Sequence, residues 1–130
     1  MMVESSKPRK QRKHRYSAPL HIKRHFVRAH LSKEARDKSN VKRRSAQVAK
    51  GDTVKIMRGG KRGTTGKVAR VDINRGFLYL ENVTRKNARG REFQIPIRPS
   101  NVYITELNLS DKLRSSKLLG SGDIDGKEGK

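Results

Sequence analysis

A glycine-punctuated hairpin in the middle of the chain constrains its fold more than any other feature. In residues 51–68, alternating apolar residues flank a loop that holds four glycines and three cations. Alternation with a period of two is typical of strands that bury one face, and glycine permits the positive φ angles that tight turns require. The segment therefore predicts two antiparallel strands joined by an exposed basic turn.

The same alternation continues over residues 47–107 and predicts a small all-β domain of about five strands. Val68 falls out of phase with its neighbours, so we expect a bulge there. Because Phe77 and Tyr79 alternate with Leu78 and Leu80, the sequence does not decide which of the two pairs in the third strand faces inward. The positions expected to face inward are Val54, Ile56, Ala69, Val71, Ile73, Leu78, Leu80, Val83, Phe93, Ile95, Ile97, Val102 and Ile104.

A basic extension, residues 1–46, precedes this domain. Up to Arg15 it has nothing to bury and repels itself, so we expect it to be disordered when free. Two short helices are expected after that, one capped by Ser17 and one that begins at Ser32 and ends at Asn40.

The C-terminal end of the chain has a different composition. Residues 108–119 predict a short helix capped by Ser110, with Leu113 and Leu118 packed on the β domain. Residues 120–130 are rich in glycine and acidic residues and are expected to be flexible.

The net charge of the chain indicates the kind of partner it binds before any motif is considered. The chain of 130 residues has 33 lysines and arginines against 12 acidic residues, a formal net charge of +21. Residues 1–50 hold 16 cations and 3 anions, residues 51–105 hold 12 and 4, and residues 106–130 hold 5 of each. The positive surface is therefore the extension plus the β domain, and such a charge is typical of proteins that bind RNA or DNA.

Composition also excludes several classes of protein. Cysteine is absent, which excludes disulfides and thiolate catalysis and favours a reducing, cytoplasmic location. No apolar run approaches the roughly 20 residues of a membrane span. No nucleophile, base and orienting residue can be grouped, so we expect neither an enzyme nor a cofactor or small-molecule substrate.

The glycine-rich turn is similar to two phosphate-binding motifs without fitting either. P-loop spacing would put the first glycine at Lys61 and the final hydroxyl at Val68. The GXXG clamp of KH domains joins two helices, whereas residues 63–66 join two strands. A plain β-turn and a turn that also contacts phosphate both remain, and the surrounding cations favour the second. The residues expected to shape turns are Gly51, Asp52, Gly63 and Gly66.

Histidines and aromatic residues supply weaker signals. His21 and His25 are one helical turn apart, but two nitrogens without a third ligand rarely hold zinc, so no metal site is expected. Hydrogen bonding or stacking on RNA is the preferred interpretation, and Tyr16 is the aromatic residue expected to contact RNA. The aromatic residues assigned to the core are Phe26, Tyr79 and Phe93.

The hairpin resembles the KOW motif, which implies an SH3-like β-barrel. That resemblance rests on Gly51-Asp52, Val54, Ile56, Gly59, Gly63 and Gly66 before Val68. Gly60 and Lys61 replace the proline and aromatic residue common in this motif, so contact at the tip through charge is implied rather than stacking. Three flanking segments, residues 17–24, 31–36 and 99–107, are similar to the ribosomal protein L24 family of archaea, called L26 in eukaryotes, in a match that extends over residues 7–115.

This resemblance implies a structural constituent of the large ribosomal subunit, monomeric there, that binds large-subunit rRNA and contacts neighbouring ribosomal proteins. It further implies a role early in assembly and a place near the peptide exit tunnel. A transcription-associated KOW protein that contacts polymerase and nascent RNA, and a DNA-compacting protein, remain as alternatives. The residues expected to contact rRNA are Arg9, Lys10, Arg12, Lys13, His14, Arg15, Tyr16, His21, Lys23, Arg24, Arg28, Arg36, Arg43, Arg44, Arg58, Gly59, Gly60, Lys61, Arg62, Gly63, Lys67, Arg85, Lys86, Arg89 and Arg91.

Overall fold

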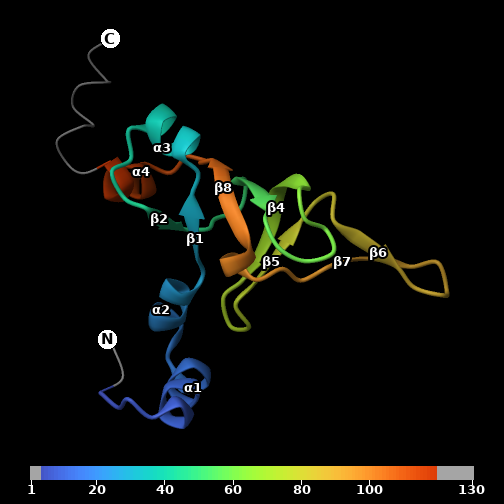
Figure 1. The fold of residues 1–130 in the computed structure, drawn as a ribbon, viewed down its shortest axis with the longest axis horizontal. Coiled ribbons are helices and arrows are strands. Elements are labelled where there is room, and N and C mark those ends of the chain that lie inside the picture. The colour runs from blue at the N-terminus through green and yellow to red at the C-terminus, as the bar shows by residue number, and fades with distance from the viewer. Residues whose placement is uncertain (1–3, 120–130) are drawn as a thin grey trace.

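The computed structural model describes residues 4–119, in which a mixed β-sheet is flanked by short helices (Figure 1). The strands are β1 (Arg28–Leu31), β2 (Ser45–Gln47), β3 (Thr53–Ile56), β4 (Thr65–Asp72), β5 (Phe77–Leu80), β6 (Thr84–Lys86), β7 (Glu92–Gln94) and β8 (Val102–Glu106). The helices are α1 (Pro8–Ser17), α2 (Leu20–Lys23), α3 (Lys33–Ser39) and α4 (Lys112–Leu119), with 3-10 turns η1 (Arg24–Phe26) and η2 (Pro99–Asn101). The predicted flexible tail, residues 120–130, lies outside the described residues.

The main sheet has the strand order β2-β1-β8-β3-β4-β5, and β6 and β7 form a separate two-stranded sheet. β8 pairs with β1 in parallel and with β3 antiparallel, so a strand from the end of the domain lies at the centre of the sheet. After β7, Ile97 pairs with Leu78 of β5 in an isolated antiparallel bridge, which places this part of the chain beside β5. The predicted class, a small barrel-like β domain with short helices at both ends, is confirmed.

Alternation along the strands builds the core. Val54 and Ile56 of β3 and Val102 and Ile104 of β8 are buried, while the residues between them face outward. Leu78 and Leu80 resolve the phase of β5 in favour of the aliphatic residues, since both are fully buried. The expected inward faces of these three strands are therefore confirmed.

β4 contains the expected bulge, with inward-facing residues on both sides of it. Val68 is 1% exposed, whereas Ala69 and Val71 are only partly buried. The pairing of β4 with β5 shifts between Val68 and Arg70, where a bulge was predicted. Because a bulge reverses the side on which the following residues lie, Val68 belongs to the core, Arg70 is exposed, and Val71 packs against the core as expected.

The extension contains more regular structure than the sequence predicts. Residues 8–17 form α1, a helix that the sequence does not predict, and β1 and β2 are not predicted either. The helix predicted from Ser32 to Asn40 is confirmed as α3: the Ser32 hydroxyl accepts a hydrogen bond from the Ala35 amide at 3.1 Å, and Asn40 ends the helix in the left-handed conformation with φ 52°.

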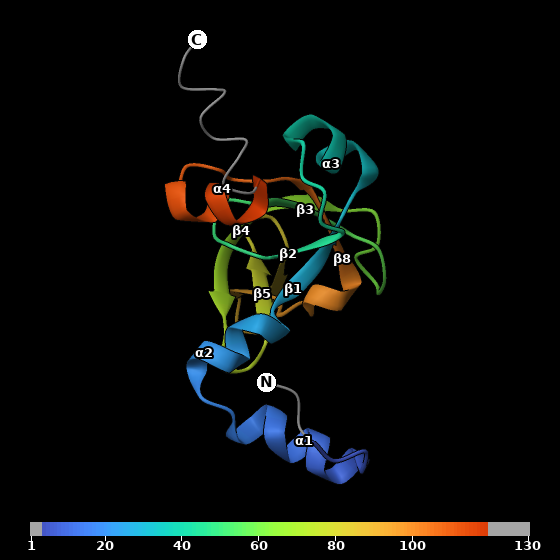
Figure 2. The ribbon, with the colours of Figure 1, turned by 90° about the vertical axis from the view of Figure 1, so that its left-hand side faces the viewer.

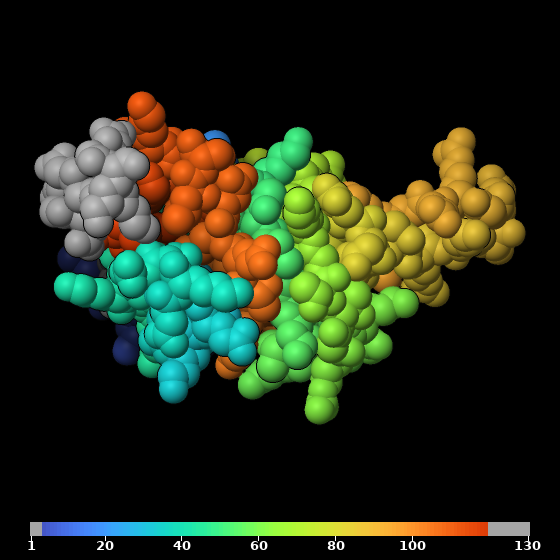
Figure 3. Space-filling model, turned by 90° about the horizontal axis from the view of Figure 1, so that it is seen from above, coloured from blue at the N-terminus to red at the C-terminus, as the bar shows by residue number. Residues whose placement is uncertain are grey.

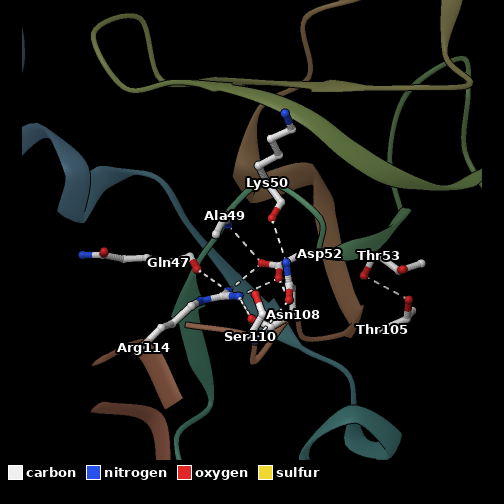
Figure 4. A network of polar contacts seen from close by, with 9 residues as sticks. All are labelled: Gln47, Ala49, Lys50, Asp52, Thr53, Thr105, Asn108, Ser110 and Arg114. Atoms are coloured by element: carbon white, nitrogen blue, oxygen red, sulfur yellow. Dashed lines mark hydrogen bonds and ion pairs between the residues drawn. The ribbon is translucent and has the colours of Figure 1, made fainter. Parts of the chain in front are cut away.

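Helix α4 is attached to the domain by a buried ion pair (Figure 4). Both carboxylate oxygens of Asp52 accept hydrogen bonds from the Arg114 guanidinium, at 2.7 and 2.6 Å. Asp111, and not Ser110, supplies the cap, because its side chain accepts from the Leu113 amide at 3.0 Å. The prediction that Leu113 packs on the domain is wrong, since it is 74% exposed, whereas Leu118 does pack against the core.

Candidate nucleic-acid interface

Three basic segments extend from the sheet: α1, the glycine loop between β3 and β4 (residues 57–64), and the β6–β7 ribbon (residues 84–94) (Figure 1). In Figure 1 the ribbon reaches to the right of the main sheet, and α1 lies below α2 on the other side. The quarter-turned view in Figure 2 also separates α1 from the sheet. The predicted contact residues therefore do not form one continuous patch.

Helix α1 presents cations and no anion. None of its residues is buried, and its first turn holds no acidic side chain. Only its C-terminal end touches the rest of the protein: His14 meets the Phe26 ring edge to face at 6.3 Å, and Arg15 lies 5.7 Å from the same ring. Phe26 is 36% exposed and outside the core cluster, so its assignment to the core is wrong; it supports α1 instead.

The glycine loop exposes its backbone as well as its cations. Gly59 and Gly63 have φ angles of +103° and +87°, and the Gly63 amide donates to the Ile56 carbonyl at 2.8 Å to close the turn. A Cβ added at Gly59, Gly60 or Gly63 would meet nothing within 4 Å. The loop tip is thus open for close approach by a ligand, and its cations, Arg58, Lys61 and Arg62, are all exposed.

The β6–β7 ribbon carries the second basic turn. The Asn87 amide donates to the Arg91 carbonyl at 2.9 Å, and Gly90 has a φ of +84°. The assignment of Phe93 to the core is wrong: it is 42% exposed and pairs across the ribbon with Arg85, because the ribbon stands apart from the main sheet. The exposed cations of the ribbon are Arg85, Lys86, Arg89 and Arg91.

The remaining predicted contacts are distributed over the extension and the sheet. His21, Arg24, Arg28, Arg43, Arg44 and Lys67 are exposed, whereas Lys23 and Arg36 are partly buried. The Gln47 Nε2 donates a hydrogen bond to Nδ1 of His25 at 3.3 Å. No group of three possible metal ligands occurs among residues 4–119, and no helix in that range is long and apolar enough to cross a membrane.

Few of these charges are neutralised within the protein. Among the described residues, only Lys86 and Arg114 lie within 4.0 Å of a carboxylate oxygen, Lys86 at 3.5 Å from Glu92 and Arg114 at 2.6 Å from Asp52. The Lys86–Glu92 pair is exposed, and an exposed ion pair is weak, so Glu92 does not prevent Lys86 from binding another anion. A small β domain with an all-cation helix and two open basic turns defines a class of protein suited to lie against a polyanion.

Comparison with known proteins identifies the family. A family model described as the eukaryotic L26 and archaeal L24 ribosomal proteins matches residues 5–120. Three similar proteins are named large ribosomal subunit protein uL24. That of Methanocella arvoryzae is 48% identical over 118 residues, which cover 91% of this chain and 94% of the relative. That of Methanospirillum hungatei is 50% identical over 118 residues, covering 91% and 97%, and that of Methanothrix thermoacetophila is 50% identical over 110 residues, covering 85% and 93%.

The chain therefore belongs to the family of ribosomal proteins called L26 in eukaryotes and L24 in archaea. The resemblance noted from the hairpin and its flanking segments is confirmed over nearly the whole described chain. Membership makes it a structural component of the ribosome and not an enzyme.

Proposed function

We propose that this chain is a constituent of the large ribosomal subunit, in the cytoplasm, that binds large-subunit rRNA through α1, the glycine loop and the β6–β7 ribbon. The relatives' names support the subunit, and the cations of those three segments, of which only Lys86 has an ion-pair partner in the described chain, support the ligand. The observation that carries the proposal is α1, a helix that buries no residue and whose charged groups are all cations or His14. Such a helix has no evident role without a polyanion beside it.

The mechanism is charge neutralisation. Each lysine or arginine placed on a phosphate releases condensed counterions, so affinity falls with salt by about 0.7 to 0.9 in log–log slope per contact. Phosphate contacts of this kind carry little sequence information, so the choice of site comes from the shape of folded RNA against the rigid sheet and its open turns. Ordering of α1 accompanies binding, because it makes few contacts in the free protein.

The proposal includes two finer expectations from the family resemblance. The chain binds early in subunit assembly, and its place is near the mouth of the peptide exit tunnel beside other large-subunit proteins. The transcription-associated alternative has no support in the comparisons.

The first test is sucrose-gradient fractionation of a native lysate at low salt and at about 0.5 M salt, where exposed charge pairs are strongly screened. Salt-resistant migration with large-subunit rRNA is expected. Migration with polymerase or chromosomal DNA, or free protein at both salt concentrations, would contradict the proposal.

The second test isolates the mechanism. The Lys61→Ala/Arg62→Ala variant of the glycine loop should bind a large-subunit rRNA transcript more weakly and with a log–log salt slope lower by about 1.4 to 1.8, as two lost phosphate contacts require. Lys112→Ala on α4 is the matched control, since Lys112 is exposed but outside the three basic segments. An unchanged slope in the loop variant would rule out phosphate contact at the loop.

A further inference from the structure

A row of three side chains crosses the outer face of the sheet. β1, β8 and β3 are neighbours, and their register places His30 beside Tyr103 and Tyr103 beside Lys55. The residues on either side of each, such as Leu31 and Ile104, point into the core. The row His30–Tyr103–Lys55 therefore lies on one level of the outer face, with an aromatic ring at its centre.

The two rings of this row are arranged together and open to a ligand. Tyr103 is 41% exposed, and its ring lies 6.2 Å from that of His30 at an interplanar angle of 76°. Its neighbours along β8, Val102 and Ile104, are buried in the core, whereas Tyr103 keeps more than a third of its surface exposed. Its ring therefore remains available on the sheet surface.

The row forms the floor of a hollow of about 740 Å³. Figure 3 shows the cyan segment with α3 and the green segment with β3 and the glycine loop on either side of the orange β8. The side walls come from α3 and from the start of the glycine loop at Met57. This volume lies within the range of pockets that hold small organic groups.

The charge of the hollow selects an anionic ligand. Its lining holds four cations, Lys33, Arg36, Arg44 and Lys55, against one carboxylate, Glu34. With an excess of three positive charges, the hollow favours a ligand that carries negative charge.

We propose that this hollow binds one unpaired nucleotide of RNA. The base stacks on the Tyr103 ring, whose edge-to-face neighbour is His30, and its phosphate contacts the cations of the hollow, Lys55 among them. Single-stranded nucleic acid is held in this way by other proteins, which combine an aromatic ring for each base with cations along the backbone. The inference rests on the proposed function and adds to it a site for an unstacked base, outside the three basic segments. It also assigns a role to Lys55 and Tyr103, neither of which is among the residues that the sequence predicts to contact rRNA.

The test compares the full-length chain and its variants in titrations with a short oligoadenylate and with the same strand made abasic. Tyr103→Ala should weaken binding of the oligoadenylate by about 5-fold or more, the loss that removal of one stacking ring produces. It should leave the salt slope unchanged and should not affect the abasic strand. Tyr103→Phe keeps the ring and should bind as the wild type does.

Two further variants separate stacking from charge and from general effects. Lys55→Ala should lower the salt slope by about 0.7, as expected for one contact with a single strand. Leu113→Ala removes an exposed apolar side chain that does not line the hollow and should change neither quantity. Equal melting temperatures of Tyr103→Ala and wild type are expected because Tyr103 is not part of the core.

A parallel titration with a large-subunit rRNA transcript distinguishes failure of this inference from failure of the proposed function. If wild type binds the transcript but Tyr103→Ala binds the oligoadenylate as wild type does, the nucleotide site is wrong and the proposed function stands. If wild type does not bind the transcript, both fail. Loss of a protein neighbour from Tyr103→Ala subunits with RNA binding intact would assign the hollow to protein and overturn the inference.

Discussion

At the scale of single residues, Asp52 is a buried carboxylate whose stability in the core depends on its hydrogen bonds and its ion pair. Its side chain is fully buried and accepts hydrogen bonds from the Ala49 and Asn108 amides at 3.0 and 2.8 Å as well as from Arg114. Arg114 also donates to the Gln47 and Asn108 carbonyls, at 3.0 and 2.7 Å. All acceptors of the buried carboxylate are thus engaged, and α4 is bonded to three separate parts of the chain.

Arg114→Ala should therefore destabilise the protein by about 3–5 kcal/mol, because it leaves a buried carboxylate without its counter-charge. Urea unfolding followed by circular dichroism measures the difference. Lys117→Ala, an exposed position on the same helix, should stay within about 0.5 kcal/mol of wild type. Similar midpoints for the two variants would show that the ion pair contributes nothing.

The glycines of the glycine loop are not equivalent either. Gly63 has a φ of +87°, whereas Gly60 does not have a positive φ. Gly63→Ala should cost about 1–2 kcal/mol in unfolding free energy, because a Cβ is strained in the left-handed region. Gly60→Ala should have an effect below about 0.5 kcal/mol, since neither the backbone nor any neighbour opposes it. The same urea experiment compares the two variants, and an equal loss from both would contradict this assignment.

At the scale of elements, local signals predicted some parts of the fold and long-range contacts decided the rest. Ser32 and Asn40 mark both ends of α3 because caps depend on near neighbours. β1 exists because it pairs with β8 in parallel, a contact that no local pattern in residues 28–31 reveals. No local pattern indicates the ion pair of Arg114 either, since its partner Asp52 is distant in the sequence.

The exposed aromatic residues show which part of the candidate site could not be predicted from the sequence. Phe93 and Tyr103 both occupy strands, where aromatic residues are common in cores, and only the layout of the sheets leaves them exposed. The basic segments were easier to predict, because charge runs and glycine turns are local. Which of their cations touch phosphate stays a prediction.

Helix α1 should be only marginally stable in the free protein. Its ten residues bury nothing, and like charges such as Arg9, Arg12 and Arg15 recur three residues apart on one face. We expect its amides to exchange rapidly with deuterium in the free chain and to become protected when a large-subunit rRNA transcript is added. The amides of β8 at the centre of the sheet are the internal reference and should be protected in both states. Strong protection of α1 without RNA would contradict coupled ordering.

At the scale of the whole molecule, the net charge of +21 is divided among segments that extend in different directions. Neutralising α1 (Arg9, Lys10, Arg12, Lys13 and Arg15 to Gln) and neutralising the ribbon (Arg85, Lys86, Arg89 and Arg91 to Gln) should each weaken binding to the rRNA transcript. The two losses should add to within about 0.5 kcal/mol, because the segments share no contacts. Filter-binding titrations of both variants and their combination test this, and strong non-additivity would mean that the segments bind as one unit.

The central position of β8 has a consequence for how the protein is made. β8 joins the β1–β2 pair to the β3–β4 pair, and it ends at Glu106, late in the chain. During synthesis the sheet cannot be completed until this strand has left the ribosome that makes it. The segment that becomes α1 is synthesised first and needs no part of the sheet. If the chain binds rRNA as proposed, its basic N-terminal segment is available to that RNA before the sheet is complete, and translation sets the order in which α1 and the sheet form.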